Sequence, residues 1–327
     1  MLIDRFGRIH NYLRISITEN CNLRCVYCVP ELKKISRLTS TVMLKEEVIE
    51  IAKTFATLGV KKIRLTGGEP LLRKDFAEIA NGLSKLDVKL SITTNGVFLD
   101  KYLTLLKNNN FETLNISLDS LKKDAYKIIT LKNSFTKVWQ NILLALDMGF
   151  SVKINIVAIK NLIENEVIDF VNLTLDYPLQ IRFIELMPFF GNNWSADKVI
   201  KADAMLAIIK KSFKNVIKIE DDKNDTSKKY KIQNAVGTFG FISTLTDQFC
   251  STCNRLRVTA DGKIKNCLFG KDELDLLTPL RKGEPLLPII QAILALKHEK
   301  LGGQLNDDFK KIKPEKIINR PMISIGG

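Results

Sequence analysis

The sequence predicts an α/β fold: an incomplete (β/α)6 barrel of TIM type, followed by a C-terminal α+β extension. Between Tyr12 and about Glu185, short β-rich apolar runs alternate with longer helix-like stretches. Strands that alternate with helices form parallel sheets. After Met187 this alternation stops. We therefore expect a barrel over residues 1–189 and a separate C-terminal region over residues 190–327.

Six runs rich in β-branched and apolar residues mark the barrel strands. They cover residues 12–18, 61–66, 88–94, 113–118, 152–159 and 179–186. The segments between them have helical spacing of apolar residues and predict helices near 44–58, 73–85, 98–108, 134–148 and 162–175.

The C-terminal region predicts fewer regular elements. We expect a helix near 203–214, an exposed charged loop at EDDKNDTSKK (220–229), a turn at Asp261-Gly262 and a last helix near 285–298.

Composition indicates a folded cytoplasmic protein with an excess of positive charge. The chain has 50 Lys plus Arg against 36 Asp plus Glu, and 45% of its residues are hydrophobic. It shows neither a run of apolar residues that predicts a membrane span nor the apolar core of a signal peptide. Most lysines are expected to be solvated, and the excess also suits a polyanion such as a nucleotide triphosphate. Basic and aromatic residues are not interleaved, which does not favour nucleic acid.

Polar, glycine-rich and cysteine-rich segments follow the predicted strands. They read TENCNLRCVYC, TGGEP, TTNG, NISLDS and IELMP. Each alone is compatible with ordinary turn chemistry. In barrels of this type the carboxyl ends of the strands form one rim, where active sites lie. Together these loops therefore predict a site on that rim.

All six cysteines fall into two triplets. Cys21, Cys25 and Cys28 form a C-x₃-C-x₂-C pattern. Thiolates in the cytosol more often bind metal than form disulfides. A [4Fe–4S] cluster normally takes four thiolates, so three would leave one iron open to another ligand. Zinc fits less well, because no histidine or fourth cysteine lies close in sequence.

The cysteine pattern after the first strand, with GGEP after the second, resembles the radical S-adenosylmethionine (SAM) superfamily. The resemblance implies a [4Fe–4S] cluster on the first triplet, with SAM on its open iron, and cleavage of SAM to a 5′-deoxyadenosyl radical. The SAM-binding residues that it implies are Tyr27, Gly67, Gly68, Glu69, Asn95, Ser117 and Met187. The carboxylate of Glu69 could equally cap the helix that starts near Leu71.

The second triplet, Cys250, Cys253 and Cys267, has the pattern C-x₂-C-x₁₃-C. With LRISITENCNLRCVYC, IRFIELMP and CSTCNRLRVTADGKIKNC, it makes the chain similar to the GTP 3′,8-cyclase family. That family acts in the first step of molybdenum cofactor biosynthesis. The similarity implies a second [4Fe–4S] cluster, whose open iron binds GTP, and the product (8S)-3′,8-cyclo-7,8-dihydroguanosine 5′-triphosphate. The implied GTP-binding residues are Arg14, Lys62, Arg64, Thr93, Lys153, Arg182, Arg255 and Arg257.

The need for cations can also be argued from the residues. A triphosphate requires several fixed positive groups, and Arg suits bidentate phosphate contacts. Arg14, Arg64, Lys153 and Arg182 lie within predicted strands, where a buried charge without a partner is costly. A single basic residue in a strand could simply point away from the core. This explanation is less satisfactory for four basic residues on four separate strands. Arg255 and Arg257, two residues apart, share one face of an extended strand.

The resemblance also implies roles for the chain's last residues. Gly326 and Gly327 would enter the active site and act in turnover with Arg255 and Arg257, and Arg320 and Met322 match the approach to this tail. The implied partners are a reductant protein and a downstream cyclic pyranopterin monophosphate synthase, and the family tends to form homodimers. No functional residue is assigned in the loop after Cys28.

Three alternatives remain open at this point. A radical SAM enzyme that modifies peptides usually has more downstream cysteines. A radical SAM enzyme that modifies tRNA is compatible with the charge. A zinc-binding module would need His10 or His298 as a fourth ligand.

Overall fold

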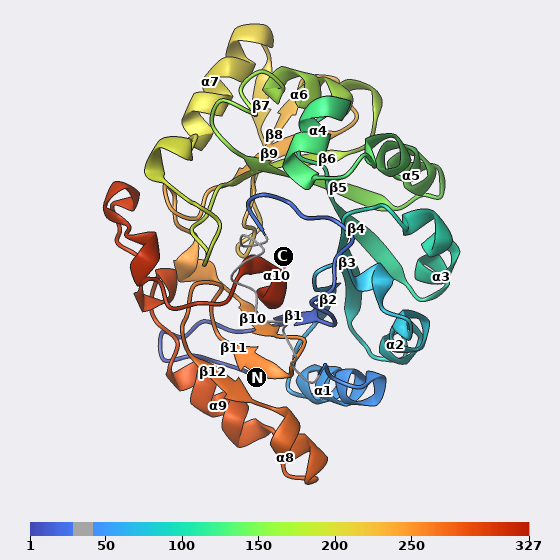
Figure 1. Cartoon of the computed structure of the whole chain (residues 1–327), viewed down its shortest axis with the longest axis vertical. Helices are drawn as coiled ribbons and strands as arrows, with labels where there is room; N and C mark the ends of the chain where they lie inside the picture. Colours follow the sequence, from blue (N-terminus) through green and yellow to red (C-terminus); the bar gives the residue numbers. More distant parts are fainter. Residues whose placement is uncertain (29–41, 327) are drawn as a thin grey trace.

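The protein forms one sheet of twelve strands, curved into an open ring with helices outside it (Figure 1). The computed structural model describes residues 1–28 and 42–326. The barrel strands are β1 (Tyr12–Ser16), β2 (Lys62–Thr66), β3 (Lys89–Thr94), β4 (Phe111–Ser117), β5 (Ser151–Ala158) and β6 (Gln180–Glu185). They pair in this order and all run parallel. The predicted incomplete barrel is confirmed.

The helices cover the outer face of the sheet. They are α1 (Lys45–Thr57), α2 (Phe76–Leu83), α3 (Leu103–Asn108), α4 (Lys123–Thr130), α5 (Phe135–Asp147) and α6 (Val167–Asp176). The sequence did not predict α4. This helix has eight residues, of which Tyr126, Ile129 and Thr130 are buried, and it is too short for its helical spacing to stand out in the sequence.

The main core lies between the sheet and these helices. On β1, Leu13 and Ile15 are fully buried in it, as are Ile51 and Phe55 of α1. Side chains alternate across a strand, so the residues between the apolar ones point to the inside of the ring. The inner face is thereby left to polar and charged residues, of which Arg14 is one.

The C-terminal segment extends the same sheet at both ends. Its strands are β7 (Val216–Lys218), β8 (Lys228–Ile232), β9 (Thr238–Ile242), β10 (Arg255–Val258), β11 (Lys263–Lys265) and β12 (Glu273–Asp275). Strand β9 pairs with β6, and β10 pairs with β1, both in parallel. The predicted boundary at residue 189 therefore lies inside one continuous sheet.

Four further helices complete the C-terminal segment. They are α7 (Ala202–Ser212), α8 (Leu277–Arg281), α9 (Leu287–Ala295) and α10 (Met322–Ile325). The last lies in the middle of the ring in Figure 1. In the described part of the chain, no helix combines the length and apolar character needed to cross a membrane.

The predicted exposed loop at 220–229 is only partly exposed. Ser227 is buried, and β8 begins at Lys228. Residues 222–226 border the central cavity. Charge composition predicted solvent exposure, but a loop that lies over a basic cavity can also be rich in Asp and Asn.

Candidate active site

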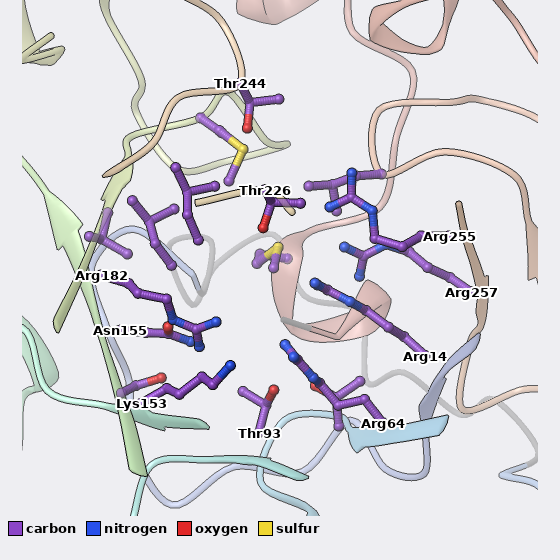
Figure 2. A pocket seen from close by; sticks show the side chains of 18 of the residues that line it. Arg14, Arg64, Thr93, Lys153, Asn155, Arg182, Thr226, Thr244, Arg255 and Arg257 are labelled. Carbon is purple, nitrogen blue, oxygen red and sulfur yellow. The ribbon is translucent and has the colours of Figure 1, made fainter. Parts of the chain in front are cut away.

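The inside of the ring holds a cavity of about 730 Å³, a volume typical of a site for small molecules. Its wall comes from the inner face and carboxyl ends of β1 to β6, and from loops of the C-terminal segment. Figure 2 shows basic side chains that enter it from two sides, with Arg14, Arg64, Arg255 and Arg257 opposite Lys153 and Arg182.

Strand register places the basic residues in rows. Arg14 on β1 lies beside Arg257 on β10 and Arg64 on β2. One row away, Tyr12 lies between Arg255 and Lys62. Parallel pairing of β10, β1 and β2 thus brings together cations that are far apart in sequence.

All the basic residues predicted to bind GTP line this cavity: Arg14, Lys62, Arg64, Lys153, Arg182, Arg255 and Arg257. Within the described residues, none of them forms a salt bridge with a carboxylate. The Nε atoms of Arg14, Arg64, Arg182 and Arg255 are buried without a hydrogen-bond partner in that part of the chain. Such groups are costly unless an anionic ligand meets them.

Burial and mutual repulsion act strongly on these cations. Burial first, then Arg182 and Lys62, lowers the pKa of Lys153 to about 8. Burial and the charge of Arg64 lower the pKa of Arg182 to about 9. In the empty cavity, the charged forms of these side chains are therefore destabilised. A bound polyanion would stabilise them.

Neutral polar groups complete the wall. Thr93 Oγ1 and Asn155 Oδ1 are buried and lack a partner among the described residues. Thr93 was predicted, whereas Asn155 was missed, although it lies two residues after Lys153 on the same face of β5. Thr226 and Thr244, also missed, enter from the C-terminal segment (Figure 2).

The first cysteine triplet lines one end of the cavity. Cys21, Cys25 and Cys28 are all free thiols. Backbone bonds from Arg24 to Thr130, 3.0 Å, and from Val26 to Ile129, 3.0 Å, fasten this loop to α4. Burial, followed by Cys21 and Asp119, raises the pKa of Cys28 to about 12. A bound iron cluster would supply the positive charge that favours the thiolates.

Tyr27, between two of these cysteines, has a fixed orientation. Its hydroxyl donates to Asp119 Oδ2 at 2.6 Å, and Asp119 Oδ1 accepts from the backbone of Val157 at 2.8 Å. Sequence reasoning missed Asp119, although it belongs to the NISLDS motif after β4. Ser117 and Met187, predicted to bind SAM, line the same end of the cavity.

The GGEP segment packs against the cysteine loop and caps a short helix. A Cβ on Gly68 would lie 2.4 Å from the carbonyl oxygen of Asn20, so only glycine allows the cysteine loop to approach β2 this closely. The buried carboxylate of Glu69 accepts bonds from Leu71 N at 3.1 Å and Asn95 N at 2.7 Å. Glu69 thus caps the short helix that begins at Pro70, and its SAM-binding role stays a prediction.

Gly67 and Asn95 lie at the same junction. Both line the cavity, and Asn95 Nδ2 is 3.7 Å from Cys21 Sγ. The SAM-binding role of these residues stays a prediction.

The second triplet lies beside the cavity, next to the lining residues Phe249, Asn254 and Leu268. Arg8 holds this region by donating to the carbonyl of Cys250 at 2.9 Å. Burial raises the pKa of Cys253, but Arg255 and Lys297 outweigh it and lower the pKa to about 6. This thiol therefore ionises readily near neutral pH and suits a metal ligand.

Each triplet offers three thiols, which is the ligand type that iron–sulfur clusters take. Among the described residues, no group of three or more His, Cys, Asp or Glu side chains is arranged to hold one metal ion. A [4Fe–4S] cluster instead takes one thiolate on each of several irons, which spaces the ligands apart.

The C-terminal tail reaches the cavity wall. Arg257 Nη1 donates to the carbonyl of Gly326 at 2.5 Å. A Cβ on Gly326 would lie 2.7 Å from Thr66 Cγ2, so the close approach needs glycine. Arg320 fastens the tail to Asp261 at 2.9 Å and Glu273 at 2.6 Å. Gly327 lies outside the described residues, as does the loop after Cys28.

Known proteins are similar to this chain in sequence. A family model described as Radical SAM superfamily matches residues 15–174, and one described as Molybdenum Cofactor Synthesis C matches residues 179–302. A protein of Peptoclostridium acidaminophilum named GTP 3′,8-cyclase is 39% identical, over 100% of this chain and 98% of that protein. This chain belongs to the GTP 3′,8-cyclase family of the radical SAM superfamily. The resemblance predicted from the cysteine motifs is confirmed.

Other members of the family differ in length. A mitochondrial GTP 3′,8-cyclase of Arabidopsis thaliana is 42% identical, over 100% of this chain and 84% of that protein. The moc-5 molybdenum cofactor biosynthesis protein of Caenorhabditis elegans is 45% identical, over 97% of this chain but 53% of that protein. The chain thus spans about half the length of this relative.

A solved structure supports the fold. Streptococcus suis SuiB, bound to S-adenosylmethionine, has a TM-score of 0.63 and 14% sequence identity, covering 87% of this chain and 68% of that one.

Proposed function

We propose that this chain is a GTP 3′,8-cyclase, which converts GTP to (8S)-3′,8-cyclo-7,8-dihydroguanosine 5′-triphosphate in molybdenum cofactor biosynthesis. One observation supports this most. Cations from separate strands, without carboxylate partners among the described residues, face a cavity that the first cysteine triplet lines and the second adjoins. An anionic substrate between two metal centres explains both features.

Two [4Fe–4S] clusters are proposed, one on each triplet, with SAM on the first. SAM would lie near Tyr27, Gly68, Ser117 and Met187, which line that end of the cavity. When bound, SAM and the reduced cluster would supply the radical that removes a hydrogen atom from C3′ of GTP. The chain's own contribution is positioning: Arg and Lys side chains fix the triphosphate, so that C3′ lies near both SAM and C8.

The bonds that change are confined to the nucleotide. The C3′–H bond breaks and C3′ bonds to C8, after which one electron and one proton complete the N7–H bond of the product. The electron requires a reductant protein. The downstream synthase, a cytoplasmic location and a homodimer are further expectations of this function.

Isotope transfer tests the proposal. Reduced protein with reconstituted clusters is supplied with SAM and with GTP deuterated at C3′. We expect deuterium in 5′-deoxyadenosine and formation of the cyclised nucleotide. Product without deuterium transfer, or no product, would sink the proposal. A Cys25→Ser variant, which lacks one ligand of the first triplet, serves as the inactive control.

Metal analysis tests the second cluster separately. Two four-iron clusters predict about eight irons per chain, and Cys253→Ser should lower this to about four. Zinc without sulfide would instead favour the zinc-binding alternative.

A further inference from the structure

Tyr12, which begins β1, lies at the centre of the basic wall. It lines the cavity and is two residues before Arg14, on the same face of the strand. In the sheet it pairs with Arg255 on one side and Lys62 on the other. Among the described strands, this row places an aromatic ring between two cations, whereas the next row places Arg14 between Arg257 and Arg64.

The ring of Tyr12 contacts three cations. Lys62 Nζ is 5.1 Å from the ring centroid, Arg64 Cζ 5.4 Å and Arg14 Cζ 5.5 Å. Each distance is within the range of a cation–π interaction. The ring therefore attracts three groups that repel one another, and it holds them on one side of the cavity.

Within the described residues, no acceptor lies in hydrogen-bond reach of the Tyr12 hydroxyl. Its oxygen is buried and has no hydrogen-bond partner in the described part of the chain. The three side chains against its ring, Arg14, Lys62 and Arg64, carry donors only. Burial raises the pKa of Tyr12, but Arg64, Arg14 and Lys62 outweigh burial and lower this pKa to about 7. A bound polyanion offsets these cations and favours the protonated phenol, which is the form that donates. A ligand that brings acceptor oxygens into this wall would satisfy it.

We propose that Tyr12 is a triphosphate-binding residue: its hydroxyl donates to a phosphate oxygen, while its ring orders Arg14, Lys62 and Arg64 around the same group. This inference rests on the proposed function, because the nucleotide is the substrate proposed for the cavity. It adds an aromatic donor to the cations and to Thr93, which the sequence had already predicted to bind GTP.

Binding to the reconstituted holoenzyme tests the role of the hydroxyl. Tyr12→Phe removes the oxygen and keeps the ring, and Tyr12→Leu removes both. We expect Tyr12→Phe to weaken binding of GTP and of inorganic tripolyphosphate about tenfold, as for one lost charge-assisted hydrogen bond. Tyr12→Leu should weaken both further, because the cations lose their ordering ring. Guanosine, which has no phosphate, should bind both variants as it binds the wild type.

Kinetics and a matched control complete the test. The loss in Tyr12→Phe should fall on KM for GTP more than on kcat. Tyr177→Phe, which removes a hydroxyl outside this cavity, should leave tripolyphosphate binding unchanged. Wild-type affinity of Tyr12→Phe for tripolyphosphate would overturn the inference, as would an equal loss for guanosine. If the wild type binds tripolyphosphate but forms no cyclised product, the proposed function fails while the role of Tyr12 is still decided.

Discussion

Lys153 on β5 shows how a single residue makes substrate binding depend on pH. Burial first, then Arg182 and Lys62, lowers its pKa to about 8. A lowered pKa means that the ammonium is charged below pH 8 and loses its charge above it. We expect GTP affinity to fall as the pH rises through 8, and Lys153→Arg, which stays charged, to remove that part of the decline. The dissociation constant of GTP, measured below and above pH 8 for the wild type and for Lys153→Arg, checks this. The same pH dependence of GTP affinity in both proteins would contradict it.

At the scale of residues, the sequence identified site residues that belong to recognisable motifs. It missed contacts that depend on how distant strands pair. Arg14 could be placed on the inner face from alternation along its own strand. The surroundings of Tyr12 could not, because Lys62 and Arg255 reach it only through pairing with two distant strands. Asn155 is a similar case. Its Oδ1 is buried without a partner among the described residues, and the burial of a single atom depends on the folded cavity wall.

The junction between the cysteine loop and β2 is the element most sensitive to small changes. A Cβ on Gly68 would meet the Asn20 carbonyl at 2.4 Å. Gly68→Ala should therefore displace the loop, cost about 1–3 kcal/mol of stability and lower the iron content by about half. Denaturant unfolding and iron analysis of the holoenzyme measure both effects.

Gly283→Ala is the control for this substitution. Its Cβ would enter open space, although the residue has a φ of 70°. We expect it to cost about 1 kcal/mol through backbone strain alone and to retain all the iron. Full iron occupancy in Gly68→Ala would show that the close approach is not needed to form the cluster site.

Elements with strong periodicity were predictable, and those held by tertiary contacts were not. The β-branched runs of β1 to β6 predicted all six barrel strands. Helix α4 was missed because it is only eight residues long and ends at Leu131, which has a φ of 56°. The parallel pairing of β9 and β10 with the barrel was also missed, because nothing local in either strand specifies its neighbour.

At the scale of the molecule, the continuous sheet makes the two segments depend on each other. Residues 1–189 alone would expose the edges of β1 and β6, which β10 and β9 cover in the whole chain. We expect this fragment to aggregate or remain partly unfolded, because exposed edges of a parallel sheet are rarely tolerated. Co-expression with residues 190–327 should restore soluble protein. A cooperative unfolding transition of the fragment alone would contradict this and would support two independent domains.

The pairing of β1 with β10 also has a consequence for protein synthesis. The partner strand of β1 emerges about 240 residues later, which at about 5–20 residues per second is a delay of roughly 10–50 seconds. During that time the nascent chain carries an unpaired β1 edge, and Arg14 lies beside that edge. Until β10 is made, we expect the basic inner face of the incomplete barrel to be open to solvent, where ribosomal RNA is a polyanion that attracts it.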